Sequence, residues 1–121
     1  MPNRKTVEAL IALVEEGKYD AAIERFYTED ASMQENLDTP RKGRATLVDG
    51  ERKVMARFKE IRAKAVGPAL IEGDRAVIHW QFEFASNNGD LRKLDELALQ
   101  RWRGELVAEE RFYYDPAQIR G

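Results

Sequence analysis

The C-terminal stretch, residues 94–115, restricts the fold more than any other part of the chain, because it predicts a long β-hairpin. Both halves alternate in character from one residue to the next, as the two faces of a strand do. Gly104 lies between the halves and permits the positive φ of a tight turn. The residues that share a face are Glu96, Ala98, Gln100 and Trp102 in the first half and Glu110, Phe112 and Tyr114 in the second. Carboxylates, an amide and aromatic rings together suit the wall of a ligand pocket better than a plain core.

Length and composition predict one globular domain over residues 1–121. A chain of 121 residues with 43% hydrophobic and 35% charged residues is typical of a compact globule with a charged exterior. The net charge of −2 gives no electrostatic reason to expect nucleic acid or an anionic membrane as a partner. No run approaches the roughly 20 apolar residues of a membrane span, and the first residues predict an amphipathic helix in place of a signal peptide. We therefore expect a cytoplasmic protein that binds neither nucleic acid nor membrane.

The residue types that usually hold metals or act as nucleophiles are scarce. The sequence has no cysteine, which excludes disulfides, thiolate nucleophiles and thiolate metal sites. The one histidine, His79, cannot form a histidine-rich metal site within a single chain, and its strand face is typical of a surface or interface position. The sequence also has no glycine-rich nucleotide motif and no calcium-binding loop. We therefore expect neither a metal nor a cofactor.

The N-terminal half predicts three helices. Apolar residues spaced by three and four predict a first helix that begins at Thr6 as its N-cap and ends before Gly17. A second, shorter helix follows Asp20, which can cap it. Helical spacing also runs from residue 44 to about residue 61 and predicts a long third helix. The residues of this helix expected to pack against a sheet are Val48, Met55 and Phe58.

The remaining segments predict strands and their connections. Residues 31–36 alternate and predict a short strand, which a loop over residues 37–43 follows. Residues 63–72 predict an edge or bulged strand, and residues 75–84 give the clearest strand pattern in the chain. With the hairpin, these segments make four antiparallel strands after the third helix. This element order predicts an α+β domain with its helices on one face of the sheet.

Three carboxylates are the strongest signals for chemistry. Glu35 and Glu96 lie on strand faces that otherwise carry apolar or pocket-like residues, and Glu110 shares its face with aromatic rings. Burial in an apolar cavity raises the pKa of a carboxyl group and so tunes it as a general base or a neutral proton donor. Ordinary salt bridges are the alternative for each carboxylate, and the candidate partners are Arg57, Arg75, Arg101 and Arg111.

Three motifs resemble the SnoaL-like family of the NTF2-like superfamily. They are Phe-Tyr-Thr-Glu-Asp-Ala at 26–31, Gly-Arg-Ala at 43–45 and the hairpin residues 101–112. The resemblance implies a cone-shaped half-barrel, in which three N-terminal helices pack on a strongly bent, mainly antiparallel sheet around a deep pocket. Homodimers through the outer sheet face are common in the family. Because the superfamily includes isomerases, dehydratases, cyclases and non-catalytic binding proteins, the resemblance specifies a fold better than an activity.

The resemblance transfers the family's catalytic positions only in part. Glu35 stands where ketosteroid isomerases place their carboxylate base. Ala98 stands about where those enzymes keep a protonated aspartate that donates a hydrogen bond. Phe112 occupies roughly the position at which polyketide cyclases of the SnoaL type carry their catalytic aspartate. Neither known mechanism therefore transfers intact.

We expect a small-molecule pocket protein, an isomerase, cyclase or dehydratase whose carboxylate moves a proton beside a carbonyl or hydroxyl group of an apolar substrate. Glu35 is the candidate base, and the groups expected to hydrogen-bond the substrate oxygen are Tyr27, Gln100 and Trp102. The full set expected around one cavity is Tyr27, Met33, Glu35, Trp80, Glu96, Gln100, Trp102, Glu110, Phe112 and Tyr114. The alternative is a non-catalytic binding or accessory module with the same cavity. A Glu35 that faces a closed cavity favours the enzyme, whereas a Glu35 paired with arginine favours the binder.

Two further expectations concern partners. Leu97 and Leu99 lie opposite the pocket-facing residues and would form an exposed apolar strip beside Val77, so we expect a homodimer through the outer sheet face. Acids at the polar end of the cavity predict a ligand that is neutral or cationic, or that carries a carbonyl or hydroxyl group, over a carboxylate or phosphate.

Overall fold

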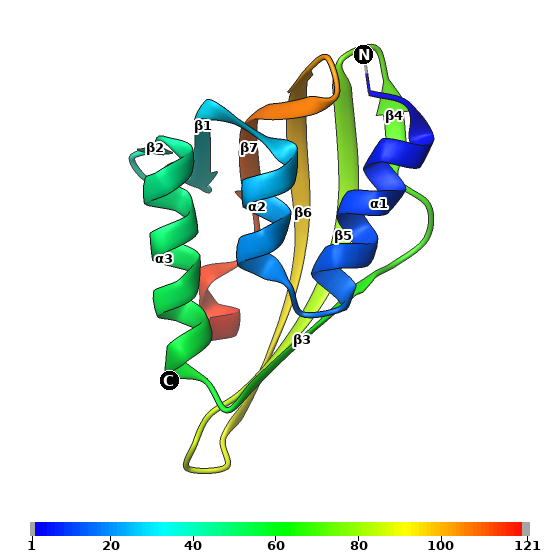
Figure 1. The fold of residues 1–121 in the computed structure, drawn as a ribbon. Helices are drawn as coiled ribbons and strands as arrows, with labels where there is room; N and C mark the ends of the chain where they lie inside the picture. The colour runs from blue at the N-terminus through cyan, green and yellow to red at the C-terminus, as the bar shows by residue number, and fades with distance from the viewer. Residues whose placement is uncertain (1, 120–121) are drawn as a thin grey trace.

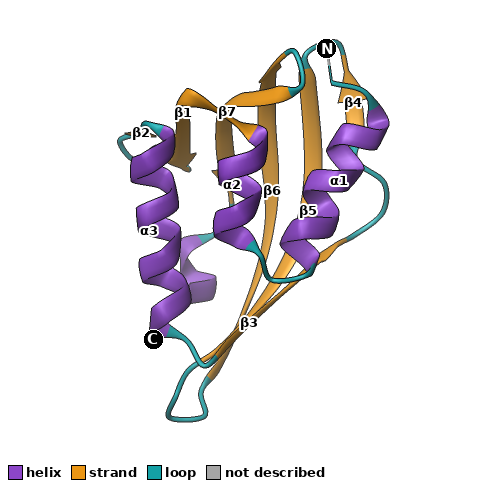
Figure 2. Ribbon diagram, in the orientation of Figure 1, coloured by secondary structure: helices purple, strands orange, loops and turns teal. Residues whose placement is uncertain are grey.

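The chain folds into three helices that lie against one face of a curved, open sheet (Figure 1, Figure 2). The computed structural model describes residues 2–119. The helices are α1 (Arg4–Glu15), α2 (Tyr19–Phe26) and α3 (Arg44–Arg57), and a short 3-10 helix, η1 (Pro116–Ile119), follows the last strand. The strands are β1 (Tyr27–Glu35), β2 (Arg41–Lys42), β3 (Glu60–Ala65), β4 (Leu70–Glu72), β5 (Arg75–Ala85), β6 (Leu91–Arg103) and β7 (Leu106–Tyr113). The α+β class expected from the sequence is confirmed.

The sheet is mainly antiparallel, as expected, but it contains one parallel pair. The strand order is β2-β1-β7-β6-β5-β3. β4 pairs with a different part of β5, along the same edge as β3. β1 runs parallel to β7, which places the strand that follows α2 next to the last strand of the hairpin. Five strands follow α3, one more than expected, because the segment around Gly67 breaks the predicted edge strand into β3 and β4. The predicted loop over residues 37–43 also contains β2, which pairs with β1.

The starts of α1 and α2 differ from the sequence expectations by three and two residues. Asn3, not Thr6, is the N-cap of α1, and its Oδ1 accepts hydrogen bonds from the Thr6 backbone N–H (2.8 Å) and hydroxyl (3.0 Å). Asn and Thr are both good caps, so the sequence alone did not distinguish them. Lys18 precedes α2 without a side-chain cap, and Asp20 lies inside the first turn, where a negative charge is favourable.

The expectation that α3 continues to Ile61 is wrong. The helix ends at Arg57, and Phe58 already has the extended backbone of a strand (φ −114°, ψ 147°). Ile61 belongs to β3, where it pairs with Phe84 of β5. Its spacing from Phe58 satisfies a helical pattern by coincidence, whereas the alternation from Ile61 to Ala65 is that of a strand. As a result Val48 is buried as expected, while Met55 and Phe58 are only half-buried.

The C-terminal hairpin is confirmed, with its turn at Gly104 and its pocket-facing side as expected. β6 and β7 pair through a turn at Gly104, whose φ is +64°, and a bulge lies between Arg101 and Trp102. The face of β6 that was expected to line a pocket is buried throughout, and the buried residues are Glu96, Ala98, Gln100 and Trp102. Leu97, on the opposite face, is 46% exposed. The hairpin therefore presents polar groups to the space under the helices.

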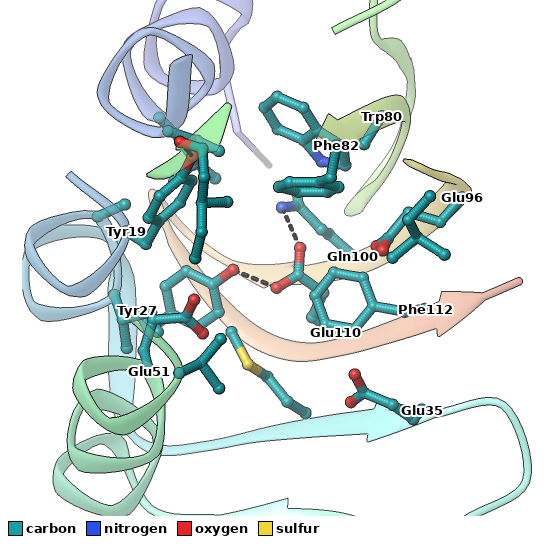
Figure 3. Close-up of a pocket in the computed structure, with 18 of the residues that line it drawn as sticks. Tyr19, Tyr27, Glu35, Glu51, Trp80, Phe82, Glu96, Gln100, Glu110 and Phe112 are labelled. Carbon is teal, nitrogen blue, oxygen red and sulfur yellow. Dashed lines mark hydrogen bonds between the residues drawn. The ribbon is translucent and has the colours of Figure 1, made fainter. Parts of the chain in front are cut away.

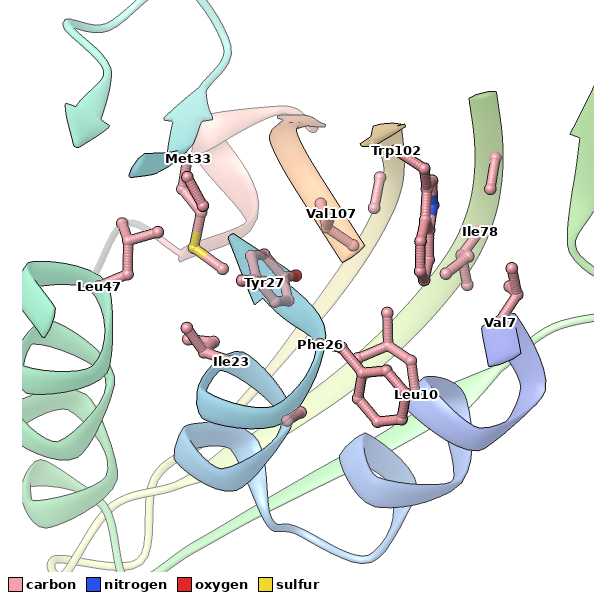
Figure 4. Packing of buried hydrophobic residues seen from close by; sticks show 14 of the residues in the cluster. Val7, Leu10, Ile23, Phe26, Tyr27, Met33, Leu47, Ile78, Trp102 and Val107 are labelled. Atoms are coloured by element: carbon pink, nitrogen blue, oxygen red, sulfur yellow. The ribbon is translucent and has the colours of Figure 1, made fainter. Parts of the chain in front are cut away.

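The hydrophobic core lies between the helices and the concave face of the sheet (Figure 4). At one end, Val7 and Leu10 of α1 pack with Trp102 of β6, and Figure 4 shows Phe26 of α2 beside Leu10. Towards the other end, the wall of the sheet becomes polar: Glu96, Gln100 and Glu110 are buried there. The packed core thus fills one part of the concave face and leaves a polar part beside it.

No helix in the described part of the chain is long and apolar enough to cross a membrane.

Candidate functional site

A cavity of about 190 Å³ lies between the helices and the concave face of the sheet (Figure 3). Its walls come from all three helices and from strands β1, β2, β3, β5, β6 and β7. The polar and charged residues that line it are Tyr19, Tyr27, Glu35, Arg41, Glu51, Glu96, Gln100 and Glu110. Apolar and aromatic side chains form the rest of the wall, which is the usual composition of a small-molecule site.

The structure brings together eight of the ten residues expected around one cavity. These eight are Tyr27, Met33, Glu35, Trp80, Glu96, Gln100, Glu110 and Phe112. Trp102 instead lies further along β6, in the hydrophobic core that packs against α1. Tyr114 lies beyond the end of β7, where its backbone N–H donates to Asn36 Oδ1 at 3.0 Å and its side chain borders a separate surface depression with Leu37. For these two residues the expectation of lining the cavity is wrong, because strand alternation gives the face but not the position along it.

Glu110 is the centre of a buried hydrogen-bond network. The Tyr27 hydroxyl donates to Glu110 Oε1, and Gln100 Nε2 donates to Glu110 Oε2 at 2.8 Å (Figure 3). Trp102 Nε1 in turn donates to Gln100 Oε1 at 3.1 Å. The groups expected to bind a substrate oxygen are therefore engaged with Glu110 or with one another. Their joint effect is to hold one carboxyl group in a fixed position on the cavity wall.

Two opposing effects set the acidity of Glu110. Burial raises the pKa of this carboxyl group, and the hydrogen bonds from Tyr27 and Gln100 lower it, because they favour the ionised form. The negative charges of Glu35 and Glu51 raise it further, and the result is a pKa of about 7. Burial also raises the pKa of the Tyr27 hydroxyl well above its usual value, so Tyr27 stays a hydrogen-bond donor. Glu110 can thus exchange a proton near neutral pH.

Glu96 is the least satisfied polar group of the site. Its side chain lies on β6 at the cavity wall, only 6% of the residue is exposed, and Oε2 has no hydrogen-bond partner within the described residues. Burial is the main cause that raises its pKa to about 8, and the charges of Glu110, Glu35 and Glu51 add to it. An unpaired buried carboxyl oxygen costs free energy, so a ligand that supplies a partner would gain by binding there.

Glu35, the base expected from the sequence, lines the cavity but is paired with a cation. Arg41 Nη2 donates to Glu35 Oε2 at 2.8 Å, and both side chains are partly exposed. Arg41 lies on β2, in a segment expected to be a loop, and was not among the arginines considered as partners. Pairing of Glu35 with arginine is the arrangement expected of a non-catalytic binder.

Three polar residues that line the cavity were not expected from the sequence: Arg41, described above, Glu51 and Tyr19. Glu51 of α3 faces the cavity beside Tyr27 (Figure 3), and burial raises the pKa of its carboxyl group. The signal was present, since Glu51 follows Leu47 by four residues and Val48 by three and therefore lies on the buried stripe of α3. Tyr19 of α2 also lines the cavity, and its hydroxyl donates to the Ile61 carbonyl at 2.8 Å.

Aromatic rings form one continuous wall of the cavity. Along β5, the Trp80 and Phe82 ring centroids lie 5.8 Å apart, and those of Phe82 and Phe84 lie 5.9 Å apart. Tyr19 approaches Phe82 from α2, with the centroids 6.4 Å apart. Such distances are typical of favourable ring pairs, and the wall that they form is apolar.

Among the described residues, no group of three or more His, Cys, Asp or Glu side chains is arranged to hold a metal ion.

Comparison with known families identifies the fold. The sequence profile of the SnoaL-like domain matches residues 7–110, most of the chain. The chain belongs to the SnoaL-like family. No curated protein matches this SnoaL-like sequence.

Solved structures resemble this SnoaL-like protein over nearly its whole length. A protein assigned as a SnoaL-like polyketide cyclase from Mesorhizobium loti is 20% identical, with 94% of this chain and 100% of that one covered and a TM-score of 0.77. A second one so assigned, from Jannaschia, is 12% identical, with 98% and 92% covered and a TM-score of 0.81. A protein with a ketosteroid isomerase-like fold from Catenulispora acidiphila, in complex with trimethylamine, is 17% identical, with 94% and 88% covered and a TM-score of 0.79. At these identities the likeness shows the fold alone.

Proposed function

We propose that this SnoaL-like protein binds a small, largely apolar molecule with a carbonyl or hydroxyl group and that Glu110 moves a proton on it. The reaction class is that of an isomerase, cyclase or dehydratase. The single observation that supports this proposal most is the position of the Glu110 carboxyl group, which is buried at the cavity wall and held by Tyr27 and Gln100. A carboxyl group with a pKa of about 7 can accept and return a proton at neutral pH.

The chemistry follows from the positions of the carboxyl groups. In the proposed step, the Glu110 carboxylate takes a proton from a carbon beside the substrate carbonyl, and the electron pair of the broken C–H bond moves onto the carbonyl oxygen. Glu110 then returns the proton at a second carbon in an isomerisation, or to a departing hydroxide, which leaves as water, in a dehydration. Glu96, with its unpartnered Oε2, is the group on the same wall that contacts the polar end of the substrate.

The structural neighbours support a small-molecule role. Two of the neighbours described above are assigned as polyketide cyclases, and a third was determined with trimethylamine. The aromatic wall formed by Trp80, Phe82 and Phe84 suits an apolar ligand in this protein as well. The cavity volume of about 190 Å³ is closer to that of a site for a single ring than to that of a site for a steroid.

A non-catalytic binding module is the second candidate function. The Glu35–Arg41 pair favours it, because the carboxylate at the position of the ketosteroid isomerase base is partly exposed and bound to a guanidinium group. In this case the same cavity holds its ligand without proton transfer. Glu96 and Glu110 then serve only to select a ligand by its polar groups.

Deuterium exchange distinguishes the two candidates. The protein is incubated with small ketones, cyclohexanone and butanone, in D₂O, and deuterium incorporation beside the carbonyl is followed by NMR. We expect the wild-type protein to accelerate exchange and Glu110→Gln to slow it by about 10²–10⁴-fold, the usual contribution of a general base. Glu109→Gln is the matched control, because Glu109 immediately precedes Glu110 on β7 but points outward to Arg101.

The outcomes separate clearly. Exchange that survives in Glu110→Gln but not in Glu35→Gln would return the role of base to Glu35. Ketones that shift the protein's own NMR signals without exchange would favour the binding module.

We also propose a homodimer through the outer face of β5 and β6, because Leu97 is half exposed on that face.

A further inference from the structure

The unpartnered carboxyl group of Glu96 points to the chemistry of the ligand. More than nine-tenths of this residue is buried, it lines the cavity, and its Oε2 has no hydrogen-bond partner within the described residues. Figure 3 shows its carboxyl oxygen on the inner side of the cavity wall, towards Gln100. Gln100 does not satisfy it: its Nε2 donates to Glu110, and its Oε1 accepts from Trp102. A molecule in the cavity can supply the missing partner.

The charges around Glu96 are almost all negative. Glu110 of β7, Glu35 of β1 and Glu51 of α3 line the same cavity, and each acts on the Glu96 carboxyl group electrostatically. The other titratable groups nearby are the phenols of Tyr19, Tyr27 and Tyr114, which stay neutral. Arg41 is the sole cationic side chain among the described residues that line the cavity, and Glu35 already pairs with it. A cationic ligand group would meet favourable charge here, whereas an anionic one would be repelled.

The walls near Glu96 suit an alkylated cation. Trp80 lies directly opposite Glu96 in the β5–β6 pairing, and Phe82 continues the same wall. Phe112 of β7 also lines the cavity. Aromatic faces attract cations such as quaternary ammonium groups while excluding water from their methyl groups. A cavity of about 190 Å³ exceeds by a little the roughly 150 Å³ that holds a benzene molecule, so the ligand is small.

From this geometry we propose that the ligand is a small alkylammonium compound, whose cationic nitrogen pairs with the Glu96 carboxylate and rests against the aromatic wall. The inference rests on the proposed function, because it concerns the same cavity. It adds the class of substrate, which is an alkylammonium compound that places its reacting carbon towards Glu110. Hydrated metal cations fit less well, since the described residues around Glu96 offer rings and no cluster of oxygen ligands arranged for a metal.

The pH dependence of binding follows with a defined sign. The pKa of Glu96 is about 8 in the free protein, so at neutral pH most of the protein must lose a proton from Glu96 before a permanent cation can pair with it. Affinity for such a cation should therefore rise with pH, by up to about tenfold per pH unit below pH 8, and level off above it. A neutral ligand that accepts a hydrogen bond from protonated Glu96 would show the opposite trend.

Calorimetric titration with choline tests the proposal. The comparison ligand is the carbon isostere of choline, in which a tert-butyl group replaces the trimethylammonium group, so that the two differ in charge and hardly in shape. We expect choline to bind at least about tenfold more tightly than the isostere at pH 8, and to release protons on binding at pH 7. In Glu96→Gln, choline affinity should fall to that of the isostere, while Glu109→Gln should bind choline like the wild-type protein.

Each contrary outcome overturns the proposal. Equal or tighter binding of the isostere, unchanged choline affinity in Glu96→Gln, or choline affinity that falls as pH rises would each show that Glu96 does not anchor a cation. Thermal melting of each variant at pH 8 checks that it is folded. The ketone exchange experiment is independent of this one: exchange catalysed by Glu110 without choline binding would leave the proposed function standing and remove only the ammonium class. Choline binding without any ketone exchange would leave the ammonium class standing and remove the proposed proton transfer.

Discussion

Gln100 and Glu110 lie directly opposite each other on β6 and β7, and Gln100 Nε2 donates to Glu110 Oε2 at 2.8 Å. The amide orientation is fixed from its other side, because Trp102 Nε1 can only donate and therefore selects Gln100 Oε1 as its acceptor. The amide nitrogen must then face Glu110. With Tyr27 on the other oxygen, both oxygens of Glu110 accept hydrogen bonds, which favours the carboxylate form.

The first prediction is that Tyr27→Phe raises the pKa of Glu110 above its value of about 7. The hydrogen bond from the Tyr27 hydroxyl stabilises the ionised form, and burial, which raises the pKa, remains after the substitution. A hydrogen bond to a charged group contributes about 1.5–3 kcal/mol, which corresponds to a rise of about one to two pKa units. Carboxyl-carbon NMR titration of the variant measures this directly.

Tyr113→Phe is the control for this titration, since Tyr113 is exposed on the opposite face of β7. It should leave the Glu110 titration unchanged. If Tyr27→Phe leaves the Glu110 midpoint unchanged or lowers it, Tyr27 does not set the acidity of the site.

The second prediction concerns the stability contribution of Glu96. The folded-state pKa of about 8 lies above the ordinary value of 4.5, so the folded protein holds a proton that the unfolded chain loses as pH rises. The contribution of Glu96 to the free energy of unfolding is therefore zero below about pH 4.5, where the group is protonated in both states. It becomes steadily more unfavourable as pH rises towards 8 and is most unfavourable above pH 8. Glu96→Gln removes this penalty but leaves a buried amide without partners.

We expect Glu96→Gln to raise the free energy of unfolding by about 2–4 kcal/mol at pH 8, after about 1–3 kcal/mol for the unpaired amide is subtracted. At pH 5 the difference should be close to zero or negative. Urea unfolding of both proteins at the two pH values measures it. A substitution that destabilises the protein equally at both pH values would mean that Glu96 is ionised and paired in the folded state.

The third prediction corrects an expectation about α3. If Phe58 were fully buried in the core, Phe58→Ala would cost about 3–5 kcal/mol. The structure places Phe58 after the end of α3, half-buried, with its ring 5.1 Å from that of Phe84. We therefore expect a loss of about 1–2 kcal/mol. Leu10→Ala, at a fully buried position in the core, should cost about 3–5 kcal/mol in the same unfolding experiment and serves as the reference.

The part of the site that lies on the hairpin was predictable from the sequence, because a strand repeats every two residues and Gly104 fixes the turn. Alternation alone is enough to assign Glu96, Gln100 and Glu110 to one face of the hairpin. Local patterns say nothing about which distant strands become neighbours. The parallel pairing of β1 with β7 determines that Tyr27 meets Glu110, and no local pattern contains it.

The role expected for Glu35 depended on a contact that its own strand pattern does not contain, although the partner is only six residues away. Its alternating strand pattern was correctly interpreted, but its partner Arg41 comes from a two-residue strand inside a segment with loop-like composition. Glu51 was predictable and was missed, since its spacing from Leu47 on the helix already placed it on the buried face. The end of α3 was ambiguous because helical and strand spacing overlap between residues 58 and 65.

The last prediction tests the homodimer. Leu97 of β6 pairs with Tyr113 of β7, and these two side chains are 46% and 41% exposed on the outer face of the sheet. Burying them against a second copy would remove apolar surface from water without affecting the cavity on the other face. We expect the wild-type protein to sediment as a dimer at micromolar concentration and Leu97→Glu to sediment as a monomer. Leu37→Glu, at an exposed leucine before β2, is the control and should remain dimeric. Because Leu97 faces away from the cavity, its substitution should leave ketone exchange unchanged per folded chain, and a wild-type monomer at these concentrations would exclude a stable dimer through this face.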